Sequence, residues 1–199
     1  MCARFLAAPT QVHLDQAVRI LAYLVNTIEL SLTFTQTAAP TLRTYVDASW
    51  AADNDTRRSR FGYGVYYGRA LVCWKSKLHS CICLSTAEAE YVGATEATKD
   101  TMWLRFLLAD MGLALAKPTT LYEDNQACMK MATNKIVSAR NKHLELKMHF
   151  VRERVDAGDI CLQYISTTLQ RADLLTKNLP RPSFERFRTL LLDPPEFVV

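Results

Sequence analysis

The sequence predicts an α/β protein built around a five-stranded mixed sheet with helices packed on it. Its 199 residues fit one domain of ordinary size plus an appendage, and they can bury a core without disulfides. Three strand-like segments follow one another, and two more come after helical segments. Successive strands pair as an antiparallel meander, whereas strands joined through helices pair in parallel. The expected element order is therefore β-β-β-α-β-α-α-β-α.

An N-terminal helix is expected over residues 9–25, because apolar side chains recur there at helical spacing and Thr10 can cap the start. The short segment 30–34 alternates apolar and polar residues like a strand. Residues 35–41, which include Pro40, are typical of a linker. A new unit is predicted to begin after them.

The meander is expected from three strand patterns. Residues 42–47 form the first, and residues 62–67 and 71–75 form two more around a tight turn at Gly68. The stretch 51–59 is rich in Asp, Asn and Arg and is predicted to be an exposed loop.

The second half of the chain alternates helices and strands. The longest helical pattern covers residues 85–111 and is ended by Gly112. The elements expected after it are a strand at 119–123, helices at 124–133 and 142–157, a strand at 160–165 and a short helix at 169–177.

Composition permits a nucleic-acid partner but does not prove one, because the formal net charge is only +4. The six cysteines are scattered without zinc-ligand spacing, and a chain with its own core does not need disulfides. Reduced thiols and a cytoplasmic or nuclear location are therefore expected. The N-terminus has no continuous apolar run, so neither a signal peptide nor a membrane span is expected.

Two acidic residues stand at strand ends, where open α/β sheets build their sites. Asp47 ends the first predicted strand, and Asp124 follows the strand at 119–123. Parallel strands place their carboxyl ends together, so both side chains are expected to face one crevice. Carboxylate oxygens are the ligands that magnesium prefers. The alternative is that each Asp only begins a turn, the commoner role of a single Asp at a strand end.

A third acid is expected on the long helix. Ser85 and Glu88 fit a capping box, which gives Glu88 a structural role. Glu90 shares a face with a stripe of small and apolar residues that is expected to lie against the sheet: Ala94, Ala97, Thr101, Leu104 and Leu108. A carboxylate there is costly unless it is paired or binds a metal, although a helix beginning before the sheet edge would leave it solvated. Asp173, taken alone, is an acid favoured by a helix N-terminus.

Several short landmarks follow one another from about Thr41 to Leu192. They are Tyr45-Val-Asp-Ala-Ser-Trp-Ala51, Arg57-Arg-Ser59, Gly62-Tyr63, Trp74-Lys-Ser-Lys77, Leu84-Ser-Thr-Ala-Glu-Ala-Glu-Tyr91, Tyr122-Glu-Asp-Asn-Gln126, Lys142-His143, His149-Phe-Val-Arg152 and Ala172-Asp-Leu-Leu-Thr-Lys177. In this order they resemble the ribonuclease H domain of copia-type retrotransposon Pol polyproteins. The resemblance assigns residues 39–178 to an RNase H-like domain, 1–38 to a C-terminal remnant of the preceding reverse transcriptase, and 179–199 to a C-terminal tail.

This resemblance implies an endonuclease that hydrolyses the RNA strand of RNA/DNA hybrids with two Mg²⁺ or Mn²⁺ ions. The ions of such sites lie about 3.5–4 Å apart and act on the attacking and leaving oxygens. Ser49 stands where the family often has a second Asp, but this removes no ligand. The loop before the last acid lacks the His that cellular ribonucleases H often carry, which predicts slower or unassisted proton transfer. The catalytic, metal-binding acids carried over residue by residue are Asp47, Glu90, Asp124 and Asp173.

Contacts to the phosphates of a hybrid are expected from a basic segment, although a solvated helix surface is an equal alternative. Its basic residues are Arg140, Lys142, Lys147, Arg152 and Arg154, and the expected substrate-binding residues are Lys142, His143, Lys147 and Arg152. His143 and His149 are six residues apart, too far for two ligands on one helix face, so packing or phosphate contact is expected of them. Packing rather than base stacking is expected of the tryptophans, Trp50, Trp74 and Trp103.

A non-enzymatic protein of transposon origin is the alternative function: a relic, a regulator or a secreted effector that acts in a host cell. Arg19-Ile-Leu-Ala22 is a degenerate form of the Arg-x-Leu-Arg signature of oomycete effectors. Against this, the tetrapeptide lies inside the predicted N-terminal helix, and no signal peptide precedes it.

Overall fold

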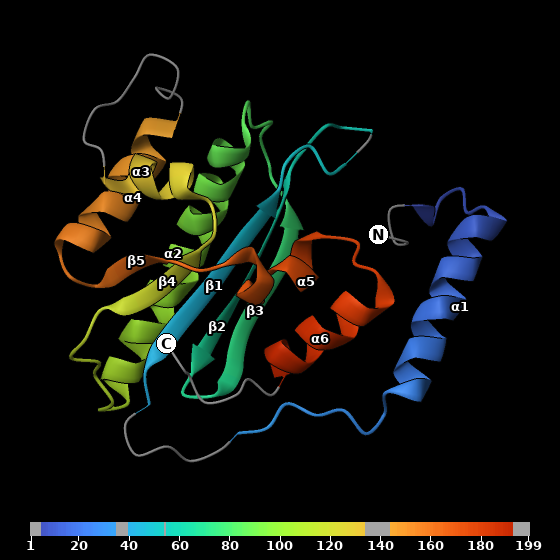
Figure 1. Ribbon diagram of the computed structural model, residues 1–199, viewed down its shortest axis with the longest axis horizontal. Helices are drawn as coiled ribbons and strands as arrows, with labels where there is room; N and C mark the ends of the chain where they lie inside the picture. Colours follow the sequence, from blue (N-terminus) through green and yellow to red (C-terminus); the bar gives the residue numbers. More distant parts are fainter. Residues whose placement is uncertain (1–4, 35–39, 54, 134–143, 193–199) are drawn as a thin grey trace. The chain divides into compact units, whose positions relative to one another are not determined.

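The computed structural model describes residues 5–34, 40–53, 55–133 and 144–192. Its sheet has five strands in the order β3-β2-β1-β4-β5 (Figure 1). β1 and β3 pair antiparallel with β2, whereas β4 pairs in parallel with β1 and with β5. The predicted five-stranded mixed sheet is therefore confirmed. The strands are β1 (Leu42–Ser49), β2 (Arg60–Tyr67), β3 (Ala70–Leu78), β4 (Thr119–Glu123) and β5 (Ile160–Tyr164).

Six α-helices and one 3₁₀ turn are present in the described residues. They are α1 (Gln11–Asn26), α2 (Thr86–Asp110), α3 (Gln126–Thr133), α4 (Glu145–Asp156), α5 (Asp173–Thr176), α6 (Arg181–Leu192) and the 3₁₀ turn η3 (Thr167–Leu169). Gly112 and Gly158 follow α2 and α4 with φ angles of +77° and +74°. A residue without Cβ adopts this conformation without strain, so both glycines end their helices as the sequence predicts.

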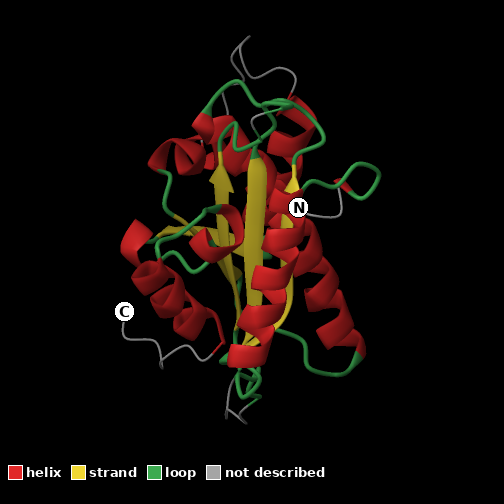
Figure 2. Cartoon of the chain, turned by 90° about the vertical axis from the view of Figure 1, so that its right-hand side faces the viewer, coloured by secondary structure: helices red, strands yellow, loops and turns green. Residues whose placement is uncertain are grey.

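The main core lies between the sheet and α2 (Figures 1 and 2). Gly93 of α2 sits directly on β2, where an added Cβ would come 3.1 Å from the Cβ of Phe61. α4 packs on the same helix, and the Tyr91 hydroxyl donates to the carbonyl of Met148 at 3.4 Å. Burial of these apolar side chains is the main contribution to the stability of this layer.

The opposite face of β2 carries α5 and α6. A Cβ at Gly62 would lie only 2.5 Å from the Cβ of Leu175, so only glycine lets α5 approach this closely. The Tyr66 hydroxyl donates to the carbonyl of Leu191 at 3.0 Å, and Phe187 and Leu191 of α6 are buried. α6 is thus part of the packed fold, although no helix was predicted in the tail 179–199.

Two predicted elements are wrong in part. The described residues 30–34 form no strand, because alternation alone supplies no neighbouring strand for their backbone hydrogen bonds. The helix predicted at 169–177 is interrupted, since an extended Gln170 with a buried side chain separates η3 from α5. The predicted start of the helix at 142–157 lies outside the described residues, and α4 begins at Glu145.

The three tryptophans are also not core residues. Trp50, Trp74 and Trp103 are 47%, 55% and 59% exposed, which excludes a core position, whereas the predicted packing role stays a prediction. The indole of Trp50 donates to the carbonyl of Cys83 at 2.9 Å, which fixes its position at the edge of the fold. A large ring with one polar atom is stable in such a half-exposed place.

The chain divides into two compact units, Met1–Leu32 and Thr33–Val199. In the first unit Thr10 holds the N-cap position of α1, and its backbone N–H donates to Nδ1 of His13 at 3.0 Å. No side chain of α1 is buried within the described residues. None of the described helices combines the length and the apolar content that crossing a membrane requires.

Candidate metal centre

Asp47 lies near the carboxyl end of β1, which extends to Ser49, and Asp124 directly follows β4. The two strands are parallel with Tyr45 opposite Tyr122, so each acid comes two residues further along its strand, at the same level. Asp173, the first residue of α5, approaches the same point. One carboxylate oxygen from each of the three lies within 4.8 Å of the other two. The structure thus brings these three predicted residues together.

A second group of acids adjoins the first. Glu90 of α2 and Glu123 of β4 join Asp124, again with oxygens within 4.8 Å of one another. Glu90 is 4% exposed and Glu123 is 0% exposed. Glu123 was not among the predicted ligands, because the strand-end pattern indicates only the acid that follows the strand, Asp124. A signal was present, since successive side chains alternate and Glu123 shares the core-facing side with the buried Leu121.

The start of α2 separates the roles of Glu88 and Glu90. The Glu88 backbone N–H donates to Oγ of Ser85 at 3.2 Å, and Oε2 of Glu88 accepts from the backbone N–H of Leu84 at 2.8 Å. This is the expected cap, with the carboxylate reaching Leu84 instead of the Ser85 amide. Glu90 lies in the acid cluster instead. Within the described part of the chain, its Oε2 has no hydrogen-bond partner.

Gln170 connects the segment before α5 to the ends of β1 and β4 through hydrogen bonds. Its Nε2 donates to the carbonyls of Val46 and Tyr122, at 2.9 and 3.5 Å, and so bridges β1 and β4 beside the acids. Its Oε1 accepts from the backbone N–H of Ala172 at 3.3 Å. A fully buried amide with these partners fixes the position from which Asp173 projects.

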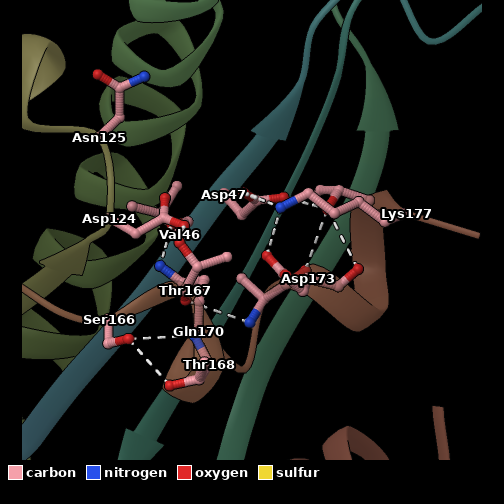
Figure 3. A network of polar contacts seen from close by, with 12 residues as sticks. Val46, Asp47, Asp124, Asn125, Ser166, Thr167, Thr168, Gln170, Asp173 and Lys177 are labelled. Carbon is pink, nitrogen blue, oxygen red and sulfur yellow. Dashed lines mark hydrogen bonds and ion pairs between the residues drawn. The ribbon is translucent and has the colours of Figure 1, made fainter. Parts of the chain in front are cut away.

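Two threonines, Thr167 and Thr176, orient the strand-end acids; Thr167 lies beside Asp124 in Figure 3. The Thr167 hydroxyl of η3 donates to Oδ2 of Asp124 at 2.8 Å. The Thr176 hydroxyl of α5 donates to Oδ2 of Asp47. Hydrogen bonds to a carboxylate hold its rotamer, so both acids are set before any ligand arrives.

Lys177 lies between two of the aspartates. Its Nζ is 3.1 Å from Oδ1 of Asp47 and 2.7 Å from Oδ1 of Asp173 (Figure 3). The two carboxylates are almost fully buried, whereas the lysine side chain is 35% exposed. Lys177 ends one of the sequence landmarks, but no role was predicted for it.

The electrostatics of the cluster disfavour charging all its carboxylates in the metal-free protein. Burial, together with Glu123, Asp47 and Asp124, raises the pKa of Glu90 to about 11. Burial and the neighbouring acids raise the pKa of Glu123 to about 8, against the effect of a hydrogen bond from the Asn125 backbone. Burial likewise raises the pKa of Asp173 to about 6, although Lys177 opposes the shift.

These residues fit a divalent cation on two observations. All the converging ligand atoms are carboxylate oxygens, which hard cations such as Mg²⁺ prefer. Oε2 of Glu90 and Oε2 of Glu123 are buried without a hydrogen-bond partner among the described residues. Bringing a positive ion to such oxygens would offset the cost of their burial and of their mutual repulsion.

The raised pKa values predict that the metal-free protein loses stability as the pH rises. Glu123 and Asp173 bind protons more tightly in the folded chain than in the unfolded chain. Their protonation therefore stabilises the fold fully below about pH 4. This stabilisation is lost as the pH rises through about 6 for Asp173 and about 8 for Glu123. We expect the melting temperature in EDTA to fall between about pH 5 and 8, and saturating Mg²⁺ to flatten the profile. Glu123→Gln should also flatten it. Parallel profiles with and without Mg²⁺ would contradict the prediction.

The predicted phosphate-binding residues are placed only in part. Lys142 and His143 lie outside the described residues. Lys147 is half-buried, with Nζ 4.0 Å from the sulfur of Cys81. Arg152 is 8% exposed and donates to the carbonyl of Met131 at 2.8 Å, so its guanidinium fastens α4 to α3. Arg152 therefore has a packing role in this structure, and its predicted contact to the phosphates of a hybrid stays a prediction.

The fold is that of ribonuclease H. LC11-RNase H1, whose structure was solved in complex with an RNA/DNA hybrid, matches with a TM-score of 0.50 and 13% identity, over 68% of this chain and 94% of that chain. At this identity the match shows the fold alone. Together with the strand order and the acids at the sheet edge, it defines an RNase H-like domain.

Over nearly its whole length the chain is similar to one region of copia-type retrotransposon Pol polyproteins. It is 38% identical over 189 residues to the Pol polyprotein of transposon TNT 1-94 from Nicotiana tabacum, and 34% identical over 185 residues to that of RE1 from Arabidopsis thaliana. These matches cover 95% and 93% of this chain but only 14% and 13% of the polyproteins. It is also 36% identical over 102 residues to secreted RxLR effector protein 161 of Plasmopara viticola, covering 72% of that protein. No protein-family profile matches the chain.

Proposed function

We propose that this chain is an RNase H-type endonuclease that hydrolyses the RNA strand of RNA/DNA hybrids. The observation that carries the proposal is the convergence of Asp47 and Asp124, at adjacent parallel strand ends, with Asp173 of α5, next to the buried Glu90. Such a concentration of buried negative charge destabilises a protein unless it serves to bind cations. Similarity to a region of copia-type Pol polyproteins supports the same conclusion.

Asp47, Glu90, Asp124 and Asp173 would hold two ions, Mg²⁺ or Mn²⁺, with Glu123 close behind Asp124. When bound, the ions supply a nucleophile at neutral pH and neutralise charge on the transferring phosphate. The chain itself contributes the fixed geometry. Gln170 holds the segment that carries Asp173, and Thr167 holds the carboxylate of Asp124. A preset site avoids the cost of ordering its ligands during the reaction.

The hybrid would be recognised by its shape and backbone. The chain is only mildly basic, and its sequence contains no base-reading motif. Ribose hydroxyls in the wide minor groove distinguish the RNA strand, and phosphates supply affinity without sequence preference. Cleavage is therefore expected to depend little on base sequence.

The decisive experiment is a cleavage assay on an end-labelled RNA/DNA hybrid with Mg²⁺ or Mn²⁺. The proposal expects cuts in the RNA strand of the hybrid and none in single-stranded RNA, duplex RNA or the DNA strand. EDTA should stop the reaction. Equal cutting of the duplex RNA control, or no cutting with either ion, would overturn the assigned activity.

Salt dependence tests the basic segment. Changing Lys142 and Lys147 together to Gln should weaken the binding of two unrelated hybrids alike and make the dependence of affinity on salt shallower, because fewer counterions are released. Lys99→Gln is the control, since that exposed lysine is already paired with Glu96 on the outer side of α2. A salt slope equal to that of the wild type would remove the segment from the binding surface.

Residues 1–38 are proposed to be the C-terminal remnant of a reverse transcriptase, and the reverse transcriptase of the same element is the proposed protein partner. The exposed apolar side chains of α1, including Leu21 and Val25, suit a helix that is covered in a longer polyprotein. Co-purification of this chain with that polymerase, and its loss after Leu21→Asp, would support the assignment.

A non-enzymatic effector stays as the second candidate because of the similarity to the Plasmopara viticola protein, which is described as a secreted RxLR effector. In this chain Arg19 and Ala22 lie inside α1, so the degenerate tetrapeptide is helical. The transcript separates the two candidates. A signal sequence encoded upstream favours the effector, and a polymerase encoded upstream favours the Pol polyprotein.

A further inference from the structure

Lys177 stands where a cation is expected to bind. Its ammonium touches one carboxylate oxygen of Asp47 and one of Asp173, at 3.1 and 2.7 Å. These two acids, with Asp124, are three of the four residues proposed to hold the divalent ions. A positive charge from the chain therefore already lies between two of the proposed ligands.

The contact offsets repulsion that the metal-free fold would otherwise carry. Asp47 and Asp173 come from elements far apart in the sequence, and both side chains are almost fully buried. Carboxylate oxygens of the two residues lie within 4.8 Å of each other, and two buried negative charges at that distance repel. The ammonium between them offsets this repulsion with two charge-assisted hydrogen bonds. The same bonds hold α5 against the end of β1.

The Lys177 side chain can also move out of the site into solvent. It follows the last residue of α5 with an extended backbone (φ −115°, ψ 146°), and its side chain is 35% exposed. A four-carbon stem with rotatable bonds can carry the ammonium into solvent without moving the helix. The two acids cannot leave in this way, because they sit on a central strand and on a packed helix.

We propose that Lys177 is an internal counter-cation, which holds Asp47 and Asp173 together in the metal-free protein and is displaced into solvent when a divalent ion binds them. This inference rests on the proposed function in taking the acids as metal ligands. Metal binding is then an exchange of one cation for another. An ammonium and a divalent ion close together at the same oxygens repel each other, so the lysine weakens metal affinity while it stabilises the empty site.

The test compares Lys177→Met with Lys75→Met, using Mn²⁺ titrations by calorimetry and melting curves in EDTA. Lys75 is a matched control, because it contacts one carboxylate, Asp100, at 3.1 Å and is 39% exposed, but it lies outside the acid cluster. Lys177→Met should lower the melting temperature in EDTA and tighten Mn²⁺ binding by about tenfold or more, because an opposing charge is removed. Lys75→Met should leave Mn²⁺ affinity unchanged.

Lys177→Arg is the second variant and keeps the positive charge, so its Mn²⁺ affinity should stay near that of the wild type. Equal or weaker Mn²⁺ binding by Lys177→Met would overturn the counter-cation role while leaving the metal site in place. Absence of Mn²⁺ binding by both the wild type and Lys177→Met would overturn the inference and the proposed function together. These outcomes do not depend on cleavage activity.

Discussion

Asp124→Asn is expected to abolish hybrid cleavage while the protein stays folded. Asp124 is the member shared by the two groups of converging acids, so its charge bears on every ion that the site could hold. Asn keeps the size of the side chain and an oxygen that can accept from Thr167. The loss is therefore one of charge, and a fall in rate on the order of a thousandfold or more is expected, comparable with removal of a group that stabilises a transition state.

Initial rates with saturating Mg²⁺ and melting curves in EDTA measure the two parts of this prediction. The melting temperature should hold or rise, because one charge is removed from a crowded cluster. Asp110→Asn is the control, since Asp110 is exposed at the far end of α2 and should leave the rate unchanged. Asp47→Asn should be as severe in rate, with lower stability from the lost contact to Lys177. If Asp124→Asn cleaves the hybrid near the wild-type rate, the strand-end acids do not take part in catalysis.

The strand-end acids could be predicted because their placement follows from local patterns. The antiparallel meander makes β3 parallel to β1, and α2 then crosses from β3 to β4, so β1 and β4 run the same way. Their parallel pairing places Asp47 and Asp124 at the same edge of the sheet. Glu90 could be predicted in the same way, because its position on the stripe of α2 that faces the sheet depends only on helical spacing. These three acids required no knowledge of distant contacts.

Asp173 could not be found from its local pattern. α5 has only four residues, and its place depends on Gln170, which bonds to carbonyls of β1 and β4 more than 40 residues away in the chain. The resemblance supplied what the pattern lacked. Glu123 was not predicted for a different reason: it is the last residue of β4, on the side opposite Asp124, and the strand-end pattern indicates only Asp124.

The errors share a physical origin in tertiary contacts. α6 is buried through its contact with Tyr66, and nothing within residues 179–199 indicates that partner. Arg152 looks like a surface charge on a basic helix, yet its guanidinium is buried because the carbonyl of Met131 accepts from it. A polar group is buried in a core when a hydrogen-bond partner is present there. The fold, and not the neighbouring sequence, decides which group that partner is.

Glu90→Gln and Glu88→Gln are expected to have opposite consequences, although the chemical change is the same and the residues are two positions apart on α2. Glu90 lies in the acid cluster with a buried oxygen that has no hydrogen-bond partner among the described residues. The Glu90→Gln protein should therefore be as stable as the wild type in EDTA, or more stable, and should cleave the hybrid about a hundredfold more slowly or worse. Glu88 caps the helix through Leu84, and an amide oxygen can accept the same hydrogen bond.

For Glu88→Gln we therefore expect a wild-type rate and a loss of at most about 0.5 kcal/mol in the free energy of unfolding, from the weaker interaction with the helix dipole. Cleavage rates at saturating substrate and urea unfolding in EDTA, measured for both variants, make the comparison. Mn²⁺ titration adds an independent reading, because Glu90→Gln should weaken binding and Glu88→Gln should not. Equal losses of rate in the two variants would show that the face of α2 turned toward the sheet does not supply the catalytic acid.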